Sequence, residues 1–220
     1  ETFPDTTVMS NLARDLHNGN YAWTENDIIS EPDKTLLRWI DTEYKLFHYF
    51  EERFYKPIYS SPFKDCQSLI DFSNEILNRR KSRAGKSLEH HLARIFTTAA
   101  LKFDEQKVTE DNKKPDFIFP GIAEYRNFAF PADDLVFLGA KTTCKDRWRQ
   151  VLNEADRIDT KYLFTLQQGV SSNQLIEMKH EHLVLVVPEA NRNCFDPAFR
   201  DDLFSLKQFI NMVKVKQSVL

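Results

Sequence analysis

The chain has 220 residues, of which 41% are hydrophobic and 29% charged, and its formal net charge is −3. This composition is typical of a globular protein with a sizeable core and excludes disordered, collagen-like and low-complexity chains. The 3 cysteines contain no CxxC pair, and no apolar run approaches the ~20 residues of a membrane helix. We therefore expect a reducing, cytoplasmic compartment, and neither a disulfide framework nor a structural zinc site.

The chain begins on Glu1 rather than Met, which predicts a fragment of a longer protein with a further domain upstream. Within the fragment we expect a single domain over residues 1–220, with an N-terminal arm and helices over 1–80 and a core over 81–220. The first 35 residues mix turn formers with short apolar pieces and predict a loosely packed arm.

Helical periodicity dominates from residue 33 to residue 102. A helix is predicted over 33–59, with an apolar stripe of Leu37, Ile40, Tyr44, Phe47, Phe50 and Phe54. Pro57 and Pro62 predict a loop, and a second helix is expected over 64–81. A third is expected over 87–102, with Gly85 as the break before it and Ser87 as its N-cap.

Dense apolar runs predict strands in the remainder of the chain, at 117–119, 135–138, 161–166 and 183–187. A helix is expected over about 146–158, between the second and third of these strands, and a final helix over 203–213. Strands that alternate with helices indicate an α/β fold, here with a helical N-terminal layer.

The first candidate site combines Asp116, at the start of one predicted strand, with Lys141, at the end of the next. If these strands pair, the two side chains can converge, and there a carboxylate can hold Mg²⁺ while a lysine orients water or stabilises a phosphate. Glu154 and Glu89, on predicted helices, could add further carboxylates. Taken singly, each residue also fits an ordinary structural role: a turn aspartate, an exposed strand end or a solvated helix acid.

The second candidate is the segment 141–149, which holds four basic residues where a strand gives way to a helix. Helix N–H groups favour phosphate, and Lys145 or Arg147 could bond guanine O6 and N7. Asp146 could accept a hydrogen bond from cytosine N4 or simply cap the helix. A capped helix with solvated charges remains the alternative.

The third candidate is the segment 79–86, where five of eight residues are basic, among them Arg83 and Lys86. In a chain with net negative charge this cluster suggests a loop that follows DNA phosphates, although an ordinary solvated loop fits as well. The HExxH, GxGxxG, Walker-type and GxSxG motifs do not occur, which disfavours zinc proteases, nucleotide-binding domains and serine hydrolases.

Together these segments resemble the PD-(D/E)XK restriction endonucleases. The resemblance rests on residues 82–89, on Lys114-Pro115-Asp116 and on Lys141 with Glu154, and it covers most of the chain. Within the superfamily the chain is similar to the branch that cuts CCNGG and CCGG-containing sites, in particular to a C-terminal catalytic domain whose site is 5′-CCWGG. The resemblance implies a restriction-endonuclease-like core over 81–220, with a mixed central sheet flanked by helices.

The resemblance also assigns roles to residues. It implies that Asp116, Lys141 and Glu154 are catalytic, that Glu89 is a helix carboxylate of the site and that Tyr125 is a site tyrosine. The second acid of the superfamily usually lies two positions before the lysine, where this chain has Gly139; in this branch it moves to the following helix, as Glu154. Asp116, Glu154 and the carbonyl of Ala140 would then hold Mg²⁺.

DNA contacts follow from the same resemblance. Lys145, Asp146 and Arg147 match the segment that reads the two G·C pairs of each half-site, and Arg83 and Lys86 lie in the basic cluster. The branch flips out the central A·T pair, for which Arg38, Trp39 and Tyr44 offer a guanidinium and aromatic faces; Trp39 and Tyr44 could instead be core or dimer contacts.

The implied activity is hydrolysis of double-stranded DNA to 5′-phosphate and 3′-hydroxyl ends by a bacterial restriction enzyme. A palindromic site implies a twofold homodimer, and the upstream portion would be a DNA-binding effector domain of the same polypeptide. Two alternatives stay open: a repair or recombination nuclease of the same fold, and a DNA-binding module whose nuclease centre is silent.

Overall fold

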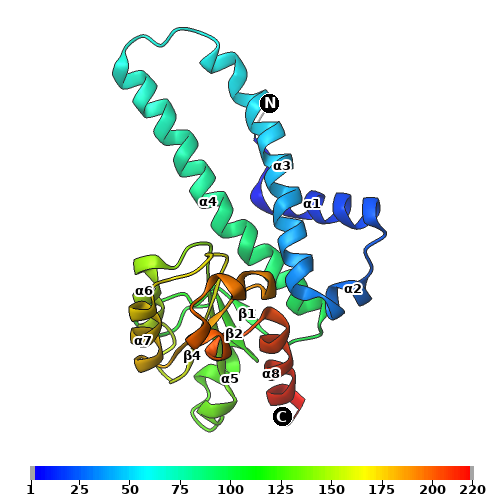
Figure 1. Cartoon of the computed structure of the whole chain (residues 1–220), viewed down its shortest axis with the longest axis vertical. Helices are drawn as coiled ribbons and strands as arrows, with labels where there is room; N and C mark the ends of the chain where they lie inside the picture. The colour runs from blue at the N-terminus through cyan, green and yellow to red at the C-terminus, as the bar shows by residue number, and fades with distance from the viewer. Residues whose placement is uncertain (1–2, 219–220) are drawn as a thin grey trace. The chain divides into compact units, whose positions relative to one another are not determined.

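Long helices fill the N-terminal half of the chain. The structure is a computed structural model and describes residues 3–218. Helices α1 (Thr6–Tyr21), α2 (Glu25–Ser30), α3 (Pro32–Tyr59) and α4 (Cys66–Thr98) precede the first strand (Figure 1). The predicted loose arm over the first 35 residues is therefore wrong, because α1 and α2 occupy most of it and α1 buries Met9 and Ala13.

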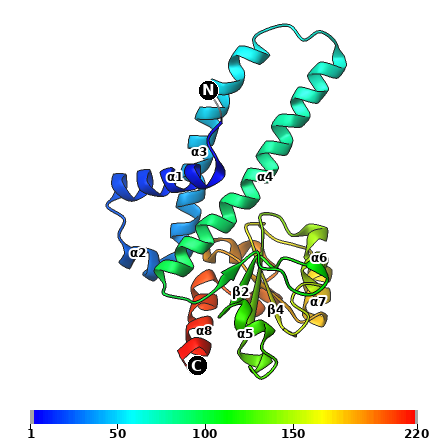
Figure 2. The same cartoon turned by 180° about the vertical axis from the view of Figure 1, so that it is seen from behind.

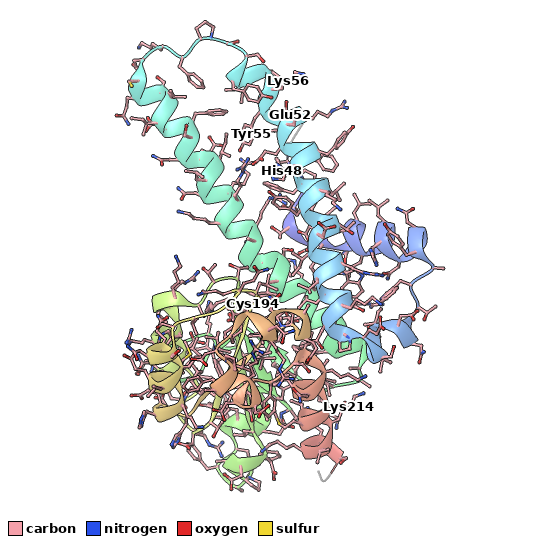
Figure 3. The ribbon with its side chains drawn as sticks, viewed as in Figure 1. His48, Glu52, Tyr55, Lys56, Cys194 and Lys214 are labelled. Carbon is pink, nitrogen blue, oxygen red and sulfur yellow. The ribbon has the colours of Figure 1, made fainter. Side chains whose placement is uncertain are left out.

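The helix predicted over 33–59 is confirmed as α3, but its buried face differs from the predicted stripe. From Leu36 onward the buried side chains are Leu36, Trp39, Glu43, Phe47, Glu51 and Tyr55, of which only Phe47 belongs to the predicted stripe. Two of them are acids with partners on α4: Glu51 accepts two hydrogen bonds from Arg80, at 2.9 and 2.6 Å. Tyr55 lies on the side of α3 that faces α4, where its ring packs edge-on against Phe72 (Figure 3).

The helices predicted over 64–81 and 87–102 form one continuous helix, α4, as the view from behind also shows (Figure 2). Gly85 lies inside α4 and does not break it, and a Cβ built at this position would meet nothing within 4 Å. Ser87 is not an N-cap, because its hydroxyl is buried and donates to Glu43 at 2.9 Å. The basic segment 79–86 is consequently helical rather than a loop.

A mixed sheet of five strands follows, in the spatial order β1-β2-β3-β4-β5. The strands are β1 (Asp104–Glu105), β2 (Phe117–Phe119), β3 (Val136–Lys141), β4 (Lys161–Thr165) and β5 (Leu183–Val186). The pairs β1–β2 and β2–β3 are antiparallel, and β3–β4 and β4–β5 are parallel. All four predicted strands are present; β1, with two acidic residues, carries no apolar pattern that could have predicted it.

Helices cover both faces of this sheet. One face packs on α6 (Trp148–Leu152) and α7 (Ser172–His180) through an apolar cluster that includes Trp148, Val151, Leu175, Met178 and Leu163. On the other, Phe96 near the end of α4 contacts Phe117, Phe119 and Phe209 of α8 (Leu206–Ser218). The predicted α/β class, with a mixed sheet flanked by helices, is confirmed.

Several helix predictions after β3 need correction. The helix expected over 146–158 reduces to a 3₁₀ turn, η3 (Lys145–Arg147), followed by α6. The chain then turns at the buried Ala155, whose φ of 56° a helix does not permit. Helix α5 (Ile122–Arg126) was not predicted, and neither was α7, although the Ser171–Gln174 capping box marks its start. The final helix is α8.

The chain forms two compact units. The first comprises Glu1–Thr24 and Leu36–Leu92, and the second Glu25–Thr35 and Ala93–Leu220. The predicted division at residues 80–81 falls within α4. Within residues 3–218, no helix combines the length and the apolar character that a membrane span requires.

The continuity of α4 makes a prediction about Gly85. Glycine loses more backbone entropy than alanine on entering a helix, and the space around Gly85 accepts a methyl group. We expect Gly85→Ala to raise the free energy of unfolding by roughly 0.5–1 kcal/mol in urea titrations. The exposed neighbour supplies the matched control, because Ala84→Gly should lower it by a similar amount; a loss of stability in Gly85→Ala would argue against a continuous helix here.

Candidate active site

Asp116 lies directly before β2 and is buried. Its Oδ2 accepts hydrogen bonds from Lys141 Nζ and from the backbone N–H of Ala140, both at 2.7 Å. Its Oδ1 accepts one from Gln106 Nε2 at 2.8 Å. The antiparallel pairing of Phe117 with Leu138 brings this end of β2 to the end of β3, so the two predicted residues meet as the strand order requires.

Lys141 is the last residue of β3, and its side chain is only 15% exposed. Its backbone position is fixed from the opposite side by the parallel pairing with Thr165 of β4. The ammonium therefore stands at the rim of the sheet with Asp116 as its ion-pair partner. Burial of both groups makes this contact stronger than a surface ion pair, because water screens it less.

Glu154 is not on a helix, contrary to the prediction, but in the turn between α6 and Ala155. Its carboxylate is largely buried, and Oε2 has no hydrogen-bond partner within the described structure. Burial raises the pKa of Glu154 to about 7; Lys141 and Lys113 oppose this shift, and Asp116 adds to it. Glu154 thus lies near enough to Asp116 and Lys141, at the ends of β2 and β3, to share their electrostatic environment.

Tyr125 is buried beside the turn that follows Glu154. Its hydroxyl donates to the Glu110 carboxylate at 2.8 Å and accepts the backbone N–H of Arg157 at 3.3 Å. Burial, together with the Glu110 carboxylate, raises the pKa of this phenol well above its ordinary value. The Arg157 guanidinium in turn donates to the carbonyls of Tyr125 and Phe130, so Tyr125 and Arg157 together connect α5 to the turn after Glu154.

The predicted recognition segment coincides with η3, at the start of the helical turn after β3. Lys145 and Arg147 are exposed, as a DNA contact requires. The side chain of Asp146 lies outside the described part of the structure. The peptide N–H groups of Cys144 and Lys145 both donate to the side-chain oxygen of Gln167, a residue that the sequence did not single out.

The remaining predicted residues lie in the first unit. Glu89 is half-buried on α4 and Lys86 is exposed one turn before it. The Arg83 guanidinium stacks over Phe3 and donates to the carbonyl of Pro4. These contacts engage Arg83 within its own unit.

The candidates for holding a flipped base differ in exposure. Trp39 is fully buried, and its indole N–H donates to Asn18 at 3.0 Å. It is therefore a core residue, and the hypothesis that it stacks on a base is wrong. Tyr44 is 62% exposed, and the Arg38 guanidinium lies over the Trp23 ring. For Arg38 and Tyr44, a role in holding a flipped base stays a prediction.

Gln106 and Lys113 also contribute to the site but were missed. Gln106 holds the second oxygen of Asp116 from a backbone with φ of 51°, and Lys113 lies 3.6 Å from Asp156, two residues after Glu154. The loop that carries both has no apolar periodicity, so only the fold places them here.

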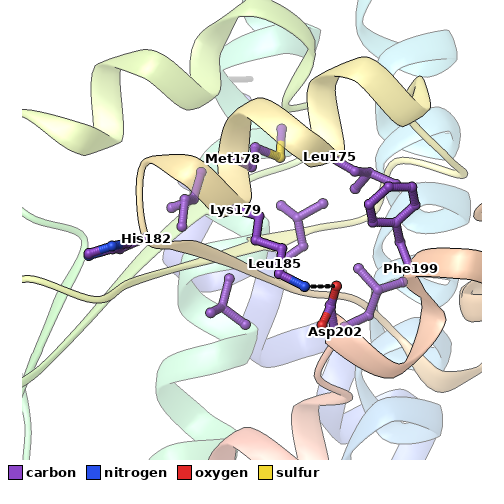
Figure 4. Close-up of a pocket in the computed structure, with 10 residues that line it drawn as sticks. Leu175, Met178, Lys179, His182, Leu185, Phe199 and Asp202 are labelled. Atoms are coloured by element: carbon purple, nitrogen blue, oxygen red, sulfur yellow. Dashed lines mark hydrogen bonds and ion pairs between the residues drawn. The ribbon is translucent and has the colours of Figure 1, made fainter.

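An apolar pocket elsewhere in the second unit is not this site. It lies between α7, β5 and the 3₁₀ segment η5 (Pro197–Asp202), with Leu175, Met178 and Phe199 in its wall and the Lys179–Asp202 ion pair at its rim (Figure 4). None of the predicted site residues lines it.

The described structure gathers no three His, Cys, Asp or Glu side chains as a metal cluster. The two carboxylates of Asp116 and Glu154 nevertheless suit a hard divalent cation, because oxygen ligands are those that Mg²⁺ prefers. The buried, unpartnered Oε2 of Glu154 is an acceptor that such an ion would satisfy. The residues present therefore fit a magnesium ion.

Known proteins of similar structure are restriction endonucleases. Metal-depleted Ecl18kI in complex with uncleaved, modified DNA superposes with a TM-score of 0.80, at 20% identity, over 99% of this chain and 80% of that one. The restriction endonuclease PspGI–substrate DNA complex gives a TM-score of 0.77, at 14% identity, over 99% and 95%. At these identities the likeness establishes the fold, and it confirms the predicted restriction-endonuclease-like core.

Relatives in sequence carry the assignment further. The type II restriction enzyme EcoRII of Escherichia coli is 46% identical over 181 residues, which is 82% of this chain and 45% of EcoRII. The type II restriction enzyme SsoII of Shigella sonnei is 28% identical over 135 residues, or 57% of this chain and 43% of SsoII. The chain thus spans less than half the length of each relative. The family described as EcoRII C terminal matches residues 47–210, and the chain belongs to this family.

Proposed function

We propose that this chain is a Mg²⁺-dependent endonuclease that cleaves double-stranded DNA at 5′-CCWGG sites and leaves 5′-phosphate and 3′-hydroxyl ends. The observation that carries the proposal is the buried Asp116–Lys141 pair beside a buried Glu154 oxygen that lacks a partner in the described structure. Family membership supports it, because the two sequence relatives are type II restriction enzymes.

Asp116 and Glu154 would hold the magnesium ion, with the carbonyl of Ala140 as a third ligand. When bound, the ion supplies positive charge that offsets the negative charge gathering on the phosphate during attack. Asp116 already forms an ion pair with Lys141, whereas Glu154 must lose a proton near pH 7 before it can bind a cation. Loading of the site therefore depends on pH through Glu154.

Lys141 acts on the attacking water. Its ammonium is held by Asp116 at 2.7 Å, which leaves its other N–H groups to orient a water molecule and to stabilise phosphate charge. The water oxygen forms a bond to phosphorus while the bond from phosphorus to O3′ breaks. The water proton passes to solvent and the departing O3′ takes one up, which gives the 5′-phosphate and 3′-hydroxyl ends.

Tyr125 supports the centre in this proposal. Tyr125 acts through the backbone, because its hydroxyl accepts the N–H of Arg157, three residues after Glu154, and so restrains the turn that carries the acid.

Lys145, Asp146 and Arg147 would read the G·C pairs of each half-site, and Arg83, Lys86 and Arg38 would contact the rest of the DNA. A palindromic site calls for a homodimer with one centre for each strand. A DNA-binding effector domain upstream in the same polypeptide and a place in a bacterial restriction system complete the proposal.

Digestion of a DNA with a single CCWGG site tests the function. We expect one cut at the site with Mg²⁺, none with EDTA and none in a site-less control. Cutting at ends or branches would favour a repair nuclease of the same fold. Intact DNA together with a specific gel shift in Ca²⁺ would indicate a silent binding module, and neither cut nor shift would defeat the proposal.

Lys141→Ala should lower the cleavage rate by roughly 10²–10³-fold or more, because it removes the cation that orients water and stabilises the phosphate. Specific binding in Ca²⁺ should persist, since the recognition segment is untouched. Lys179→Ala is the matched control, because Lys179 forms an exposed ion pair with Asp202 away from the site. A Lys141→Ala protein that cuts at the normal rate would show that the centre lies elsewhere.

Glu154→Gln tests the buried acid by its effect on stability. The folded-state pKa of about 7 exceeds the ordinary 4.5, so the stability that protonated Glu154 provides is present below pH 4.5 and is lost as the pH rises through 7. Glutamine avoids this loss. Without divalent cations, we expect Glu154→Gln to be more stable than wild type by about 2 kcal/mol at pH 8 and nearly equal at pH 5, in urea unfolding.

The exposed Glu181→Gln serves as the control and should change little at either pH. An equal effect of Glu154→Gln at both pH values would contradict a buried acid with a raised pKa. Added Mg²⁺ should stabilise the wild type at pH 8 more than at pH 6, and should lose this effect in Glu154→Gln.

Arg147→Ala should relax discrimination at the guanine that Arg147 reads, by about 1–3 kcal/mol for each hydrogen-bonded base that the alanine can no longer reach. The measurement compares binding to the 5′-CCWGG site with binding to sites that carry one replaced G·C pair. Arg149→Ala is the control, because Arg149 pairs with Glu177 at 2.6 Å and stacks on Trp148. Uniform weakening on all DNA would make Arg147 a phosphate contact instead.

A further inference from the structure

Gln167 contacts the predicted recognition segment from another part of the sheet. It lies two residues after the end of β4, and its side-chain oxygen accepts the N–H of Cys144 at 2.9 Å and that of Lys145 at 3.1 Å. These are the two peptide groups that lead into η3.

The start of a helical turn leaves N–H groups without partners in the turn itself. Cys144 occupies the cap position of η3, and its side chain makes no cap hydrogen bond. Its carbonyl accepts the N–H groups of Arg147 and Trp148, at 2.7 and 3.1 Å. Gln167 therefore serves as a remote cap: it fixes the N–H side of Cys144 while the carbonyl side begins the turn that presents Lys145 and Arg147.

The Gln167 side chain is itself held in one orientation. Its Nε2 donates to the carbonyl of Gly169 at 2.9 Å, which directs Oε1 toward Cys144. Gly169 has a φ of +90°, and a Cβ at this position would approach the carbonyl oxygen of Cys194 to 2.8 Å, so only glycine suits this turn. The Asn191 amide fixes the preceding carbonyl, that of Leu166, at 3.2 Å.

The same residues connect the recognition segment to the catalytic lysine. Thr165 pairs with Lys141 in the parallel register of β3 and β4. The Thr165 hydroxyl accepts the N–H of Gln167 at 3.2 Å and donates to the carbonyl of Thr142 at 3.4 Å. Lys141 and η3 are thus connected through space by the pairing of Lys141 with Thr165 and by the contacts of Gln167 with Thr165, Cys144 and Lys145.

We propose that Gln167 is a positioning residue for sequence recognition, which sets the recognition turn at 145–147 in place relative to Lys141. This inference rests on the proposed function and deepens it. A purely structural role would alter stability or overall activity, whereas a positioning role alters the choice between DNA sequences. The two roles are therefore separable by experiment.

The experiment compares Gln167→Ala, Gln167→Glu and the exposed neighbour variant Gln168→Ala with wild type. For each, kcat/KM is measured on DNA with 5′-CCWGG and on DNA with one G·C pair of the site replaced. We expect the ratio between the two substrates to fall about 10-fold or more in Gln167→Ala, comparable to the removal of one base-reading hydrogen bond. Gln167→Glu keeps an oxygen for both N–H groups but replaces the Nε2 donor to Gly169 with a second acceptor, so its ratio should lie between those of Gln167→Ala and wild type. Gln168→Ala should stay within about 3-fold of wild type.

Amide hydrogen exchange supplies a readout that needs no DNA. The Cys144 and Lys145 amides should exchange faster in Gln167→Ala than in wild type, and Gln167→Glu, which keeps the acceptor but not the donor to Gly169, should show a smaller increase. An unchanged discrimination ratio in Gln167→Ala overturns the positioning role, and so does an equal loss on all sequences with a lowered Tm. A wild type that does not cleave CCWGG DNA overturns the proposed function, and the recognition role with it, whatever the exchange data show.

Discussion

The ion pair between Asp116 and Lys141 is the contact around which the second unit is arranged. Asp116 is almost fully enclosed, and its carboxylate would be costly to bury without the Lys141 ammonium and the N–H groups of Ala140 and Gln106. The partners come from two segments, because Ala140 and Lys141 belong to β3 and Gln106 to the loop before β2. The charge can therefore be accommodated only when β2, β3 and this loop are correctly placed. Loss of either charge would leave the other buried and unpaired, which destabilises far more than the pair stabilises.

Glu154 lies in the same electrostatic environment as Asp116, but its carboxylate is less well supplied with hydrogen-bond partners. Asp116 has partners on both oxygens, whereas one oxygen of Glu154 is buried without any in the described structure, and its pKa rises to about 7. A pair of carboxylates, one satisfied and one not, is a poor arrangement for stability alone. It is a reasonable arrangement for a site that completes its coordination only when a cation arrives, and groups with perturbed pKa values of this kind concentrate at functional sites.

The sequence predicted those parts of the fold whose signals are local. The sequence predicted the four apolar strands, because strands that are buried on both faces leave dense hydrophobic runs with polar ends. It also predicted that Asp116 precedes one strand and that Lys141 ends the next. The break at Gly85 and the helix through Glu154 were wrong for tertiary reasons. Ser87 is drawn into the interior by Glu43, and the buried Ala155 imposes a left-handed turn. The buried face of α3 was misplaced because its acids are paired by α4, which a hydropathy pattern does not reveal.

The parallel register of β3 and β4 joins chemistry to recognition. Lys141 ends one strand and pairs with Thr165 on the other, and Gln167, two residues later, reaches back to the turn that follows Lys141. A shift of this register would move the ammonium and the recognition turn together, since both depend on the same ladder. Gln167 could not be recognised from its sequence neighbours, because its partners Cys144 and Lys145 are more than 20 positions away. Residues that position a site through the backbone therefore become visible only once the strand order is known.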